Sequence, residues 1–240
     1  MRRLDLPPRY LLYVGTIEPR KNIMTLPRAY CCLPESVRAR CPLLLVGGWS
    51  WNAGDVADFL KSGARQHGVM YRNYVPESDL AALYNGARAL VFPSLYEGFG
   101  LPPVEMLACG GAVLASTAGA VVETVGRQAH LIEPLDIDGW REAMRRVVED
   151  DEWWRSLRQG AVAVVKPFTW EQCAADTLRV YRQLCGERGT QTGGVKKQTA
   201  ACGFAMEILS HKRPVRPRTG NQLPQYDGAA IICGCHRMGG

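Results

Sequence analysis

The stretch that decides the fold is residues 89–105, which read ALVFPSLYEGFGLPPVE. Its first four residues form a continuous apolar run that Pro93 ends. Short apolar runs bounded by breakers are typical of strands buried on both faces of a sheet. Two glycines then flank Phe99, where they allow a tight turn, and the apolar spacing of Pro103–Cys109 indicates a helix. The stretch therefore predicts a buried strand, a tight loop and a helix, in that order.

The same alternation extends outward in both directions. Three further short apolar runs are predicted as strands: Tyr10–Val14, Leu43–Val46 and Ala112–Ala115. Amphipathic stretches between the runs are predicted as helices: Asp55–His67, Ser78–Asn85 with Ser78 as its N-cap, and Pro103–Cys109. Alternating strands and helices form right-handed βαβ units around a parallel sheet. We therefore expect an α/β fold with a doubly wound parallel sheet, the Rossmann-like arrangement.

Three more helices are expected to complete the domain: Ile137–Glu149, Glu152–Val165, and a last one from near Thr169 to Leu184. Thr169 and Gln172 have the capping-box spacing that marks the start of a helix. Beyond Gly186 neither the strand nor the helix period is sustained. We therefore expect a domain over residues 10–186 and a poorly ordered basic tail over residues 187–240.

Composition is that of an ordinary globular protein. Of the 240 residues 47% are hydrophobic, but no apolar run approaches the ~20 residues that span a bilayer. The start of the chain is basic and lacks the apolar stretch of a secretory signal, so we expect a cytoplasmic protein. The net charge of +6 favours phosphorylated ligands or weak association with the inner face of a membrane, unless it reflects only a solvated basic tail.

The nine cysteines predict neither a disulfide framework nor a metal site. Without a secretory signal we expect reduced thiols, and six lie in contexts that favour burial: Cys31, Cys32, Cys41, Cys109, Cys173 and Cys185. Cys202, Cys233, Cys235 and His236 match no standard zinc spacing. We therefore predict no bound metal.

The loop after the strand at residues 89–92 is a candidate anion site. The peptide N–H groups of Gly98–Leu101 precede a predicted helix N-terminus, where unpaired donors and the helix dipole favour a pyrophosphate. Glu97 lies in the loop and Glu105 in the helix. Because ionised carboxylates only accept hydrogen bonds, they suit sugar or ribose hydroxyls. The alternative is a capped strand–helix junction with two surface glutamates.

Two more loops follow predicted strands at the carboxyl ends, where doubly wound sheets bind their ligands. Gly15 allows a tight turn after the first strand, and Arg20 and Lys21 bring two cations that would stabilise a diphosphate. Arg20 has an alternative, which is to be an exposed and solvated residue. Gly47 and Gly48 leave room for a ligand after the second strand, unless they form only a strand-ending turn.

The segment from Glu97 to Glu105 resembles the hallmark of the retaining GT-B glycosyltransferases known as family 4, in which seven residues including Gly-Phe-Gly separate two glutamates. The resemblance implies that Glu97 acts in catalysis, because it contacts the hydroxyls of the donor sugar near the reacting centre. It implies that Glu105 holds the ribose of the nucleotide. The amides of Phe99, Gly100 and Leu101 would face the sugar and the phosphates.

The remainder of the donor site follows from the same resemblance. The first loop is similar to the family's glycine-rich phosphate-binding loop, with Lys21 as the phosphate ligand. Thr16 stands where many relatives have an arginine, in a form of the loop often found in mannosyltransferases. The loop at Gly47 would lie near the nucleotide, and the backbone of Tyr74 and Val75 would meet the base.

The resemblance covers Tyr10–Cys185 and implies the C-terminal, donor-binding half of a GT-B enzyme, with residues 1–9 as a remnant of the interdomain linker. We expect transfer of a hexose, with mannose as one option, from a GDP- or UDP-sugar to an acceptor hydroxyl. We expect no cofactor, no Asp-X-Asp metal site and no nucleic acid partner. The chain would then be a fragment, the partner of a separate acceptor subunit, or a nucleotide-sugar-binding module without turnover.

Two other enzyme classes fit less well. A dinucleotide-dependent dehydrogenase would need Gly-X-Gly-X-X-Gly after the first strand, which is absent. A two-carboxylate hydrolase would need an acid and a nucleophile that bracket one bond, and the helical position of Glu105 does not favour this. One departure from the family concerns the fold: Pro27 falls within the helix expected after Asn22, so that helix must begin late, kink or be weakened.

Overall fold

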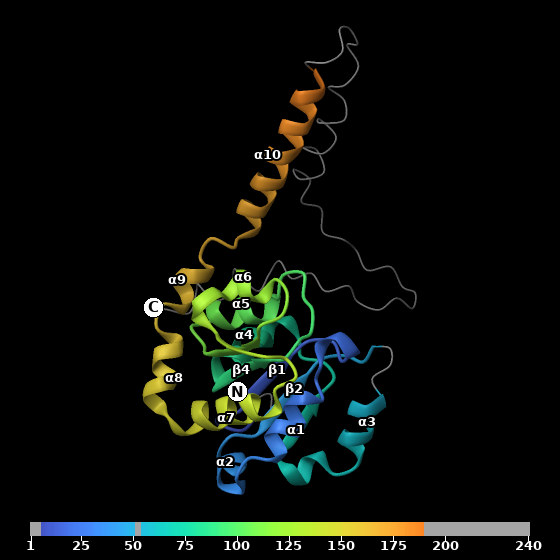
Figure 1. Cartoon of the computed structure of the whole chain (residues 1–240), viewed down its shortest axis with the longest axis vertical. Helices are drawn as coiled ribbons and strands as arrows, with labels where there is room; N and C mark the ends of the chain where they lie inside the picture. Colours follow the sequence, from blue (N-terminus) through green and yellow to red (C-terminus); the bar gives the residue numbers. More distant parts are fainter. Residues whose placement is uncertain (1–5, 51–53, 190–240) are drawn as a thin grey trace. The chain divides into compact units, whose positions relative to one another are not determined.

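A computed structural model describes residues 6–50 and 54–189 of the chain. The described residues fall into two compact units, one that ends at Pro167 and one that begins at Phe168. The first unit is built on a six-stranded sheet in which every pairing is parallel (Figure 1). Its strands are β1 (Leu11–Val14), β2 (Leu43–Val46), β3 (Val69–Arg72), β4 (Ala89–Phe92), β5 (Val113–Ser116) and β6 (His130–Ile132).

The strand order is β3-β2-β1-β4-β5-β6, so the winding direction reverses between β1 and β4. This order is that of a doubly wound sheet, and the predicted fold class is confirmed. Leu11 of β1 lies opposite Leu43 of β2 on one side and Ala89 of β4 on the other. All residues of β1, β2, β4 and β5 are buried, which explains why their sequences are continuous apolar runs.

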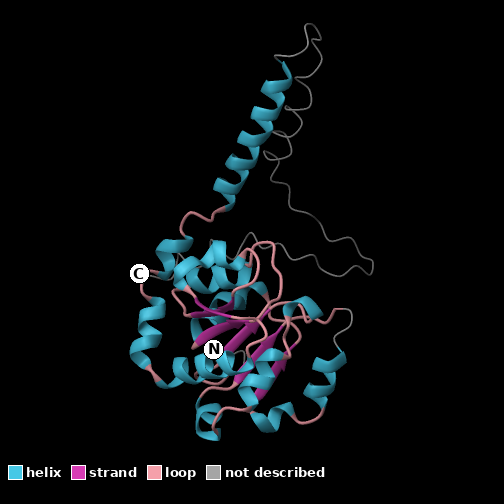
Figure 2. Cartoon of the chain, in the orientation of Figure 1, coloured by secondary structure: helices cyan, strands magenta, loops and turns pink. Residues whose placement is uncertain are grey.

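Helices cover both faces of the sheet (Figure 2). On one face α5 packs against α4, α6 and α9, and on the other α1 packs against α7. The helices of this unit are α1 (Thr25–Cys31), α2 (Glu35–Arg40), α3 (Gly54–Lys61), α4 (Glu77–Gly86), α5 (Leu101–Ala108), α6 (Val121–Val125), α7 (Ile137–Glu149), α8 (Asp151–Arg158) and α9 (Ala161–Val165). Three short 3-10 turns accompany them: η2 (Pro19–Lys21), η3 (Ala64–His67) and η4 (Gly126–Gln128).

The sequence patterns missed the two edge strands. In β3 only Val69 is fully buried, and β6 has three residues that run from exposed His130 to buried Ile132. An edge strand covered on one side lacks the continuous apolar run that marks a central strand.

Several helix boundaries differ from those expected. Helix α1 begins late, at Thr25, which places Pro27 in its first turn, where no intrahelical N–H bond is lost. The helix predicted over Glu152–Val165 is broken at Gly160, which has φ +84° and separates α8 from α9. Gly63, with φ +114°, likewise ends the helix predicted to reach His67.

Ser78 was wrongly expected to be an N-cap. Helix α4 begins one residue earlier than predicted, so Pro76 is its N-cap and Ser78 lies in the first turn. Asp79 lies in the first turn as expected, where a negative charge suits the helix dipole.

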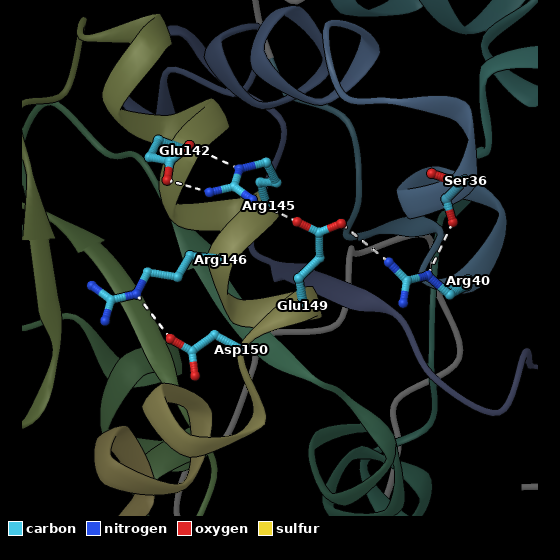
Figure 3. A network of polar contacts seen from close by, with 7 residues as sticks. All are labelled: Ser36, Arg40, Glu142, Arg145, Arg146, Glu149 and Asp150. Carbon is cyan, nitrogen blue, oxygen red and sulfur yellow. Dashed lines mark hydrogen bonds and ion pairs between the residues drawn. The ribbon is translucent and has the colours of Figure 1, made fainter.

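A chain of surface ion pairs follows α7 and reaches α2 (Figure 3). Arg145 pairs with both Glu142 and Glu149, and Glu149 in turn accepts a hydrogen bond from Arg40 of α2 at 3.3 Å. Exposed pairs of this kind contribute little to stability, because water screens them. The network therefore orients α7 against α2 more than it stabilises the fold.

The second unit contributes α10 (Trp170–Gly189). Its start is as predicted, because the hydroxyl of Thr169 accepts the N–H of Gln172 at 3.1 Å. The helix continues past Leu184 through residues 187–189, where the basic tail was expected to begin. The rest of that tail, with Cys202, Cys233, Cys235 and His236, lies outside the described residues.

The described part of the chain contains no helix long and apolar enough to cross a membrane. Its six cysteines are all free thiols. The expectation that they are buried is correct only for Cys41; Cys32, Cys173 and Cys185 are exposed.

Candidate functional site

The loops after β1, β2 and β4 meet at the carboxyl edge of the sheet, beside the point where the strand order reverses. The N–H of Leu95 donates to the carbonyl of Arg20 at 2.8 Å, which joins the loop after β4 to the loop after β1. The N–H of Ile17 donates to the carbonyl of Gly48 at 2.9 Å, which joins the loops after β1 and β2. Three of the predicted ligand loops are therefore hydrogen-bonded into one surface.

A buried ion pair lies at the centre of this surface. The Nζ of Lys21 is 2.6 Å from Oε1 of Glu97, and the two residues are only 8% and 7% exposed. Arg20 reaches the other carboxylate oxygen at 3.3 Å and also pairs with Glu18 at 2.6 Å. Lys21 lies over the ring of Phe92 at 5.6 Å from its centroid, within the range of a cation–π contact. The structure thus brings together Arg20, Lys21 and Glu97, three of the predicted ligand residues.

The turn η2 places the two cations. Pro19 fixes the start of the turn, and Asn22 ends it with φ +52° in the left-handed region. The amide of Asn22 donates to the carbonyl of Pro93 at 3.1 Å and to that of Pro134 at 2.7 Å. Asn22 therefore ties the first loop to the loops after β4 and β6. No role was predicted for Asn22, although its position directly after the two cations indicated that it belongs to the same loop.

The loop from Glu97 to α5 leaves the start of that helix without a side-chain cap. Gly100 is the N-cap residue, with φ +86°, and it has no side chain that could cap the helix. Because Pro102 and Pro103 have no N–H, Leu101 has the only peptide N–H among the first three residues of α5. The hydroxyl of Thr124 on α6 donates to the carbonyl of Phe99 at 3.0 Å and holds the loop against that helix. Phe99 and Leu101 remain exposed. An uncapped helix N-terminus next to a lysine suits an anion.

Gly15 and Gly47 are explained by their close approach. A Cβ atom on Gly47 would lie 1.9 Å from the carbonyl oxygen of Gly15, and both residues have φ +152°. The two glycines allow the loops after β1 and β2 to touch, so their first role is structural. Neighbouring Thr16 is exposed, and its carbonyl accepts a hydrogen bond from the hydroxyl of Tyr13.

Glu105 is buried in α5 and is held by a residue of α4. It is 6% exposed, and the hydroxyl of Tyr84 on α4 donates to its Oε2 at 2.6 Å. Burial raises the pKa of Glu105 above its ordinary value of 4.5, and the hydrogen bond from Tyr84 offsets part of this shift. Tyr84 is a contact that the sequence reading missed, because an apolar helix pattern does not show which hydroxyl will meet a buried acid.

The residues predicted to meet the base lie at the start of α4. Tyr74 is 62% exposed, whereas Val75 is buried. The ring of Trp49 packs against that of Tyr71 at a centroid distance of 5.3 Å, and Tyr71 donates to the carbonyl of Gly47. Trp49 is therefore an anchor of the loop after β2.

A hollow of about 400 Å³ opens beside the first loop. Glu18, Pro19 and Asn22 line it on one side, and Asp55 and Val56 of α3 on the other. It borders η2 through Pro19, but Lys21 and Glu97 are not among the residues that line it.

Metal ligands do not gather in the described residues, where no three His, Cys, Asp or Glu side chains come together. Residues 136–138 do have the Asp-X-Asp spacing, which the expectation of no such motif overlooked. Asp136 caps α7 by accepting the N–H of Gly139, and Asp138 pairs with Arg141. Both carboxylates therefore form contacts within α7. Metal independence stays a prediction.

Comparison with known proteins shows the family of the chain. The model of the family "Glycosyl transferases group 1" matches residues 2–162. The chain is 39% identical over 175 residues to O-antigen chain mannosyltransferase B of Escherichia coli, which covers 73% of this chain and 46% of that protein.

Solved glycosyltransferase structures share the fold. Sucrose-phosphate synthase from Thermosynechococcus elongatus has a TM-score of 0.66 and 31% identity, over 78% of this chain and 48% of that one. Anabaena HepE in complex with UDP has a TM-score of 0.61 and 21% identity, over 75% of this chain and 51% of that one. The chain spans about half the length of these relatives. It belongs to the glycosyl transferases group 1, and its fold is one half of the GT-B architecture.

Proposed function

We propose that the chain forms the donor-binding half of a retaining glycosyltransferase, which moves a hexose from a nucleoside diphosphate sugar to an acceptor hydroxyl. The observation that carries the proposal is the buried pair of Lys21 and Glu97 beside the uncapped N-terminus of α5. A cation and the peptide amides of the loop that leads into α5 suit the diphosphate, and a carboxylate next to them suits the hydroxyls of the attached sugar.

In the proposed reaction the bond from the anomeric carbon to the diphosphate breaks and a bond to the acceptor oxygen forms. The released diphosphate accepts the acceptor's proton. Lys21 and the amides near Gly100 stabilise the charge that develops on the leaving group. Glu97 orients the sugar and balances positive charge at its anomeric carbon. Glu105, held by Tyr84, binds the ribose.

Mannose is the first candidate for the sugar. The support is the 39% identity to an O-antigen chain mannosyltransferase. The support for a nucleotide donor is the shared fold with HepE, which was solved with UDP. The acceptor would bind to a second domain or subunit that faces this one, as the half-length match to the relatives suggests.

Calorimetric titration with GDP-mannose, GDP, UDP-glucose and UDP tests donor binding. We expect binding that Lys21→Met and Glu105→Gln each weaken by about 10- to 100-fold, because each removes a hydrogen bond to or from a charged group. Lys166→Met and Glu152→Gln are matched controls, since both of these side chains are exposed elsewhere on the unit. Failure of the wild-type chain to bind any of the four ligands would overturn the proposal.

A transfer assay then separates an enzyme from a binding module. The chain is joined to the acceptor-binding half of a relative and supplied with the donor that binds best. Transfer that Glu97→Gln reduces supports the proposed role of this carboxylate. Binding without transfer in the joined protein favours a module that only holds the nucleotide sugar.

A further inference from the structure

A second hollow lies at the amino edge of the sheet, opposite the candidate donor site. It has a volume of about 180 Å³, and it is bordered by residues that lie one or two positions before three strands: Arg9 before β1, Arg88 before β4 and Gly111 before β5. The ends of α4 and α5 and the indole of Trp154 complete its wall. Three arginines and no carboxylate line it.

Arg88 is a fixed wall of this hollow. It is 4% exposed, its Nε donates to the carbonyl of Val147 at 2.7 Å, and its Nη2 pairs with Asp151 at 2.5 Å. Its guanidinium lies 4.1 Å from the ring centroid of Trp154. Arg88 therefore joins β4 to α7 and α8 through its Nε and Nη2 atoms.

Arg158 and Arg9 are the two solvent-exposed arginines of the hollow. Arg158 is exposed and lies 4.3 Å from the same indole ring, where its Nε donates to the carbonyl of Gly110. Arg9 is also exposed, and neither residue forms an ion pair with a carboxylate of the described residues. A fourth arginine close by, Arg40, is committed to Glu149 (Figure 3).

This arrangement concentrates positive charge in a recess. Among the described residues Asp151 is the carboxylate beside these arginines: it pairs with Arg88, and the charge of Arg9 also lowers its pKa. Three guanidinium groups therefore line the hollow against one nearby carboxylate of the described residues, which leaves an excess of positive charge. Like charges that line one small hollow repel one another, and an anion between them reduces the repulsion. Guanidinium groups present paired N–H donors that match the oxygens of a phosphate.

We propose that the hollow binds a small phosphate-bearing molecule, with Arg9 and Arg158 as its ligands and Arg88 and Trp154 as its walls. The residues are distinct from those of the proposed donor site, and the proposal does not depend on that function. Tyr84 connects the two places, because it lines the hollow and its hydroxyl holds Glu105. An occupant would therefore be placed to influence the buried carboxylate.

The test is a titration of the chain with inorganic phosphate, followed by ¹H–¹⁵N NMR. The indole N–H of Trp154, which donates to the carbonyl of Arg88, is the reporter and is assigned with Trp154→Phe. We expect a saturable shift of this signal. It should need at least about tenfold more phosphate in Arg9→Gln and in Arg158→Ala, because each loses a charged donor. Arg9→Gln is the variant least able to disturb folding, since Arg9 is exposed.

Two controls separate this site from the others. Arg155→Ala removes an exposed arginine from the same helix as Arg158 and should leave the titration unchanged. Lys21→Met should also leave it unchanged, even if it abolishes nucleotide binding at the carboxyl edge. A shift of the Trp154 signal that does not saturate, or that survives in both Arg9→Gln and Arg158→Ala, would overturn the proposal.

Discussion

Removing either partner of the Lys21–Glu97 pair should destabilise the fold by an amount set by the burial of the pair. Lys21→Met leaves a carboxylate that is 7% exposed, with Arg20 at 3.3 Å as its remaining cation. Breaking a buried pair by removing one partner costs about 3–5 kcal/mol, and because Arg20 stays we expect about 2–3 kcal/mol. Glu97→Gln leaves the ammonium without a carboxylate and should cost about 3–4 kcal/mol.

The double variant decides whether the pair acts as a unit. Once both charges are gone, no unpaired charge remains, so the combined loss should fall short of the sum by about 2 kcal/mol. Urea unfolding followed by circular dichroism measures all four proteins. Lys166→Met and Glu152→Gln are exposed controls that should change stability by less than about 0.5 kcal/mol. Losses that add to within about 0.5 kcal/mol would refute the reasoning, because the contact would then contribute nothing of its own.

Three further outcomes follow from the same structure. Tyr84→Phe should cost about 1–3 kcal/mol in urea unfolding, because it leaves a buried carboxylate oxygen of Glu105 without its donor. Burial raises the pKa of Glu105 above 4.5, so the folded chain holds this proton more tightly than the unfolded chain. Stability should therefore fall as the pH rises from about 4.5 through the raised pKa, and urea unfolding across pH should show that Glu105→Gln lacks this fall. Gly47→Ala should cost about 3 kcal/mol or more, because its Cβ would lie 1.9 Å from the carbonyl oxygen of Gly15, whereas Gly98→Ala, whose Cβ would meet nothing within 4 Å, should unfold at nearly the wild-type urea concentration.

The sequence predicted the centre of the sheet and missed its edges. The strands β1, β2, β4 and β5 are buried on both faces, so their apolar runs are continuous and end at breakers. Strands β3 and β6 expose part of their residues, and their mixed patterns do not stand out from loops. The break at Gly160 was also missed, because a glycine within a helical pattern does not reveal its positive φ.

The sequence was sufficient to predict which loops of the candidate site meet, because these loops follow the carboxyl ends of parallel strands. Parallel strands share a carboxyl edge, so the loops that contain Lys21 and Glu97 had to meet once the strand order was known. The direct contact between the two side chains was not predicted, because Lys21 was assigned to the phosphates of the donor and Glu97 to the hydroxyls of its sugar. Asn22 and Tyr84 were missed because their partners, a carbonyl after β6 and an acid on α5, are distant in sequence.

The direct contact changes how a ligand must enter the site. Glu18, Arg20, Lys21 and Glu97 are linked by ion pairs, and their formal charges sum to zero. A bare diphosphate therefore gains little from net charge and has to draw Lys21 away from Glu97. That exchange leaves a buried carboxylate with fewer donors, which is unfavourable. A diphosphate that carries a sugar supplies both new partners, because its oxygens accept from Lys21 while its hydroxyls donate to Glu97. If the chain binds the proposed donor, the pair should therefore favour the complete donor over the nucleotide alone, because a single contact of 2.6 Å would connect sugar recognition to phosphate binding.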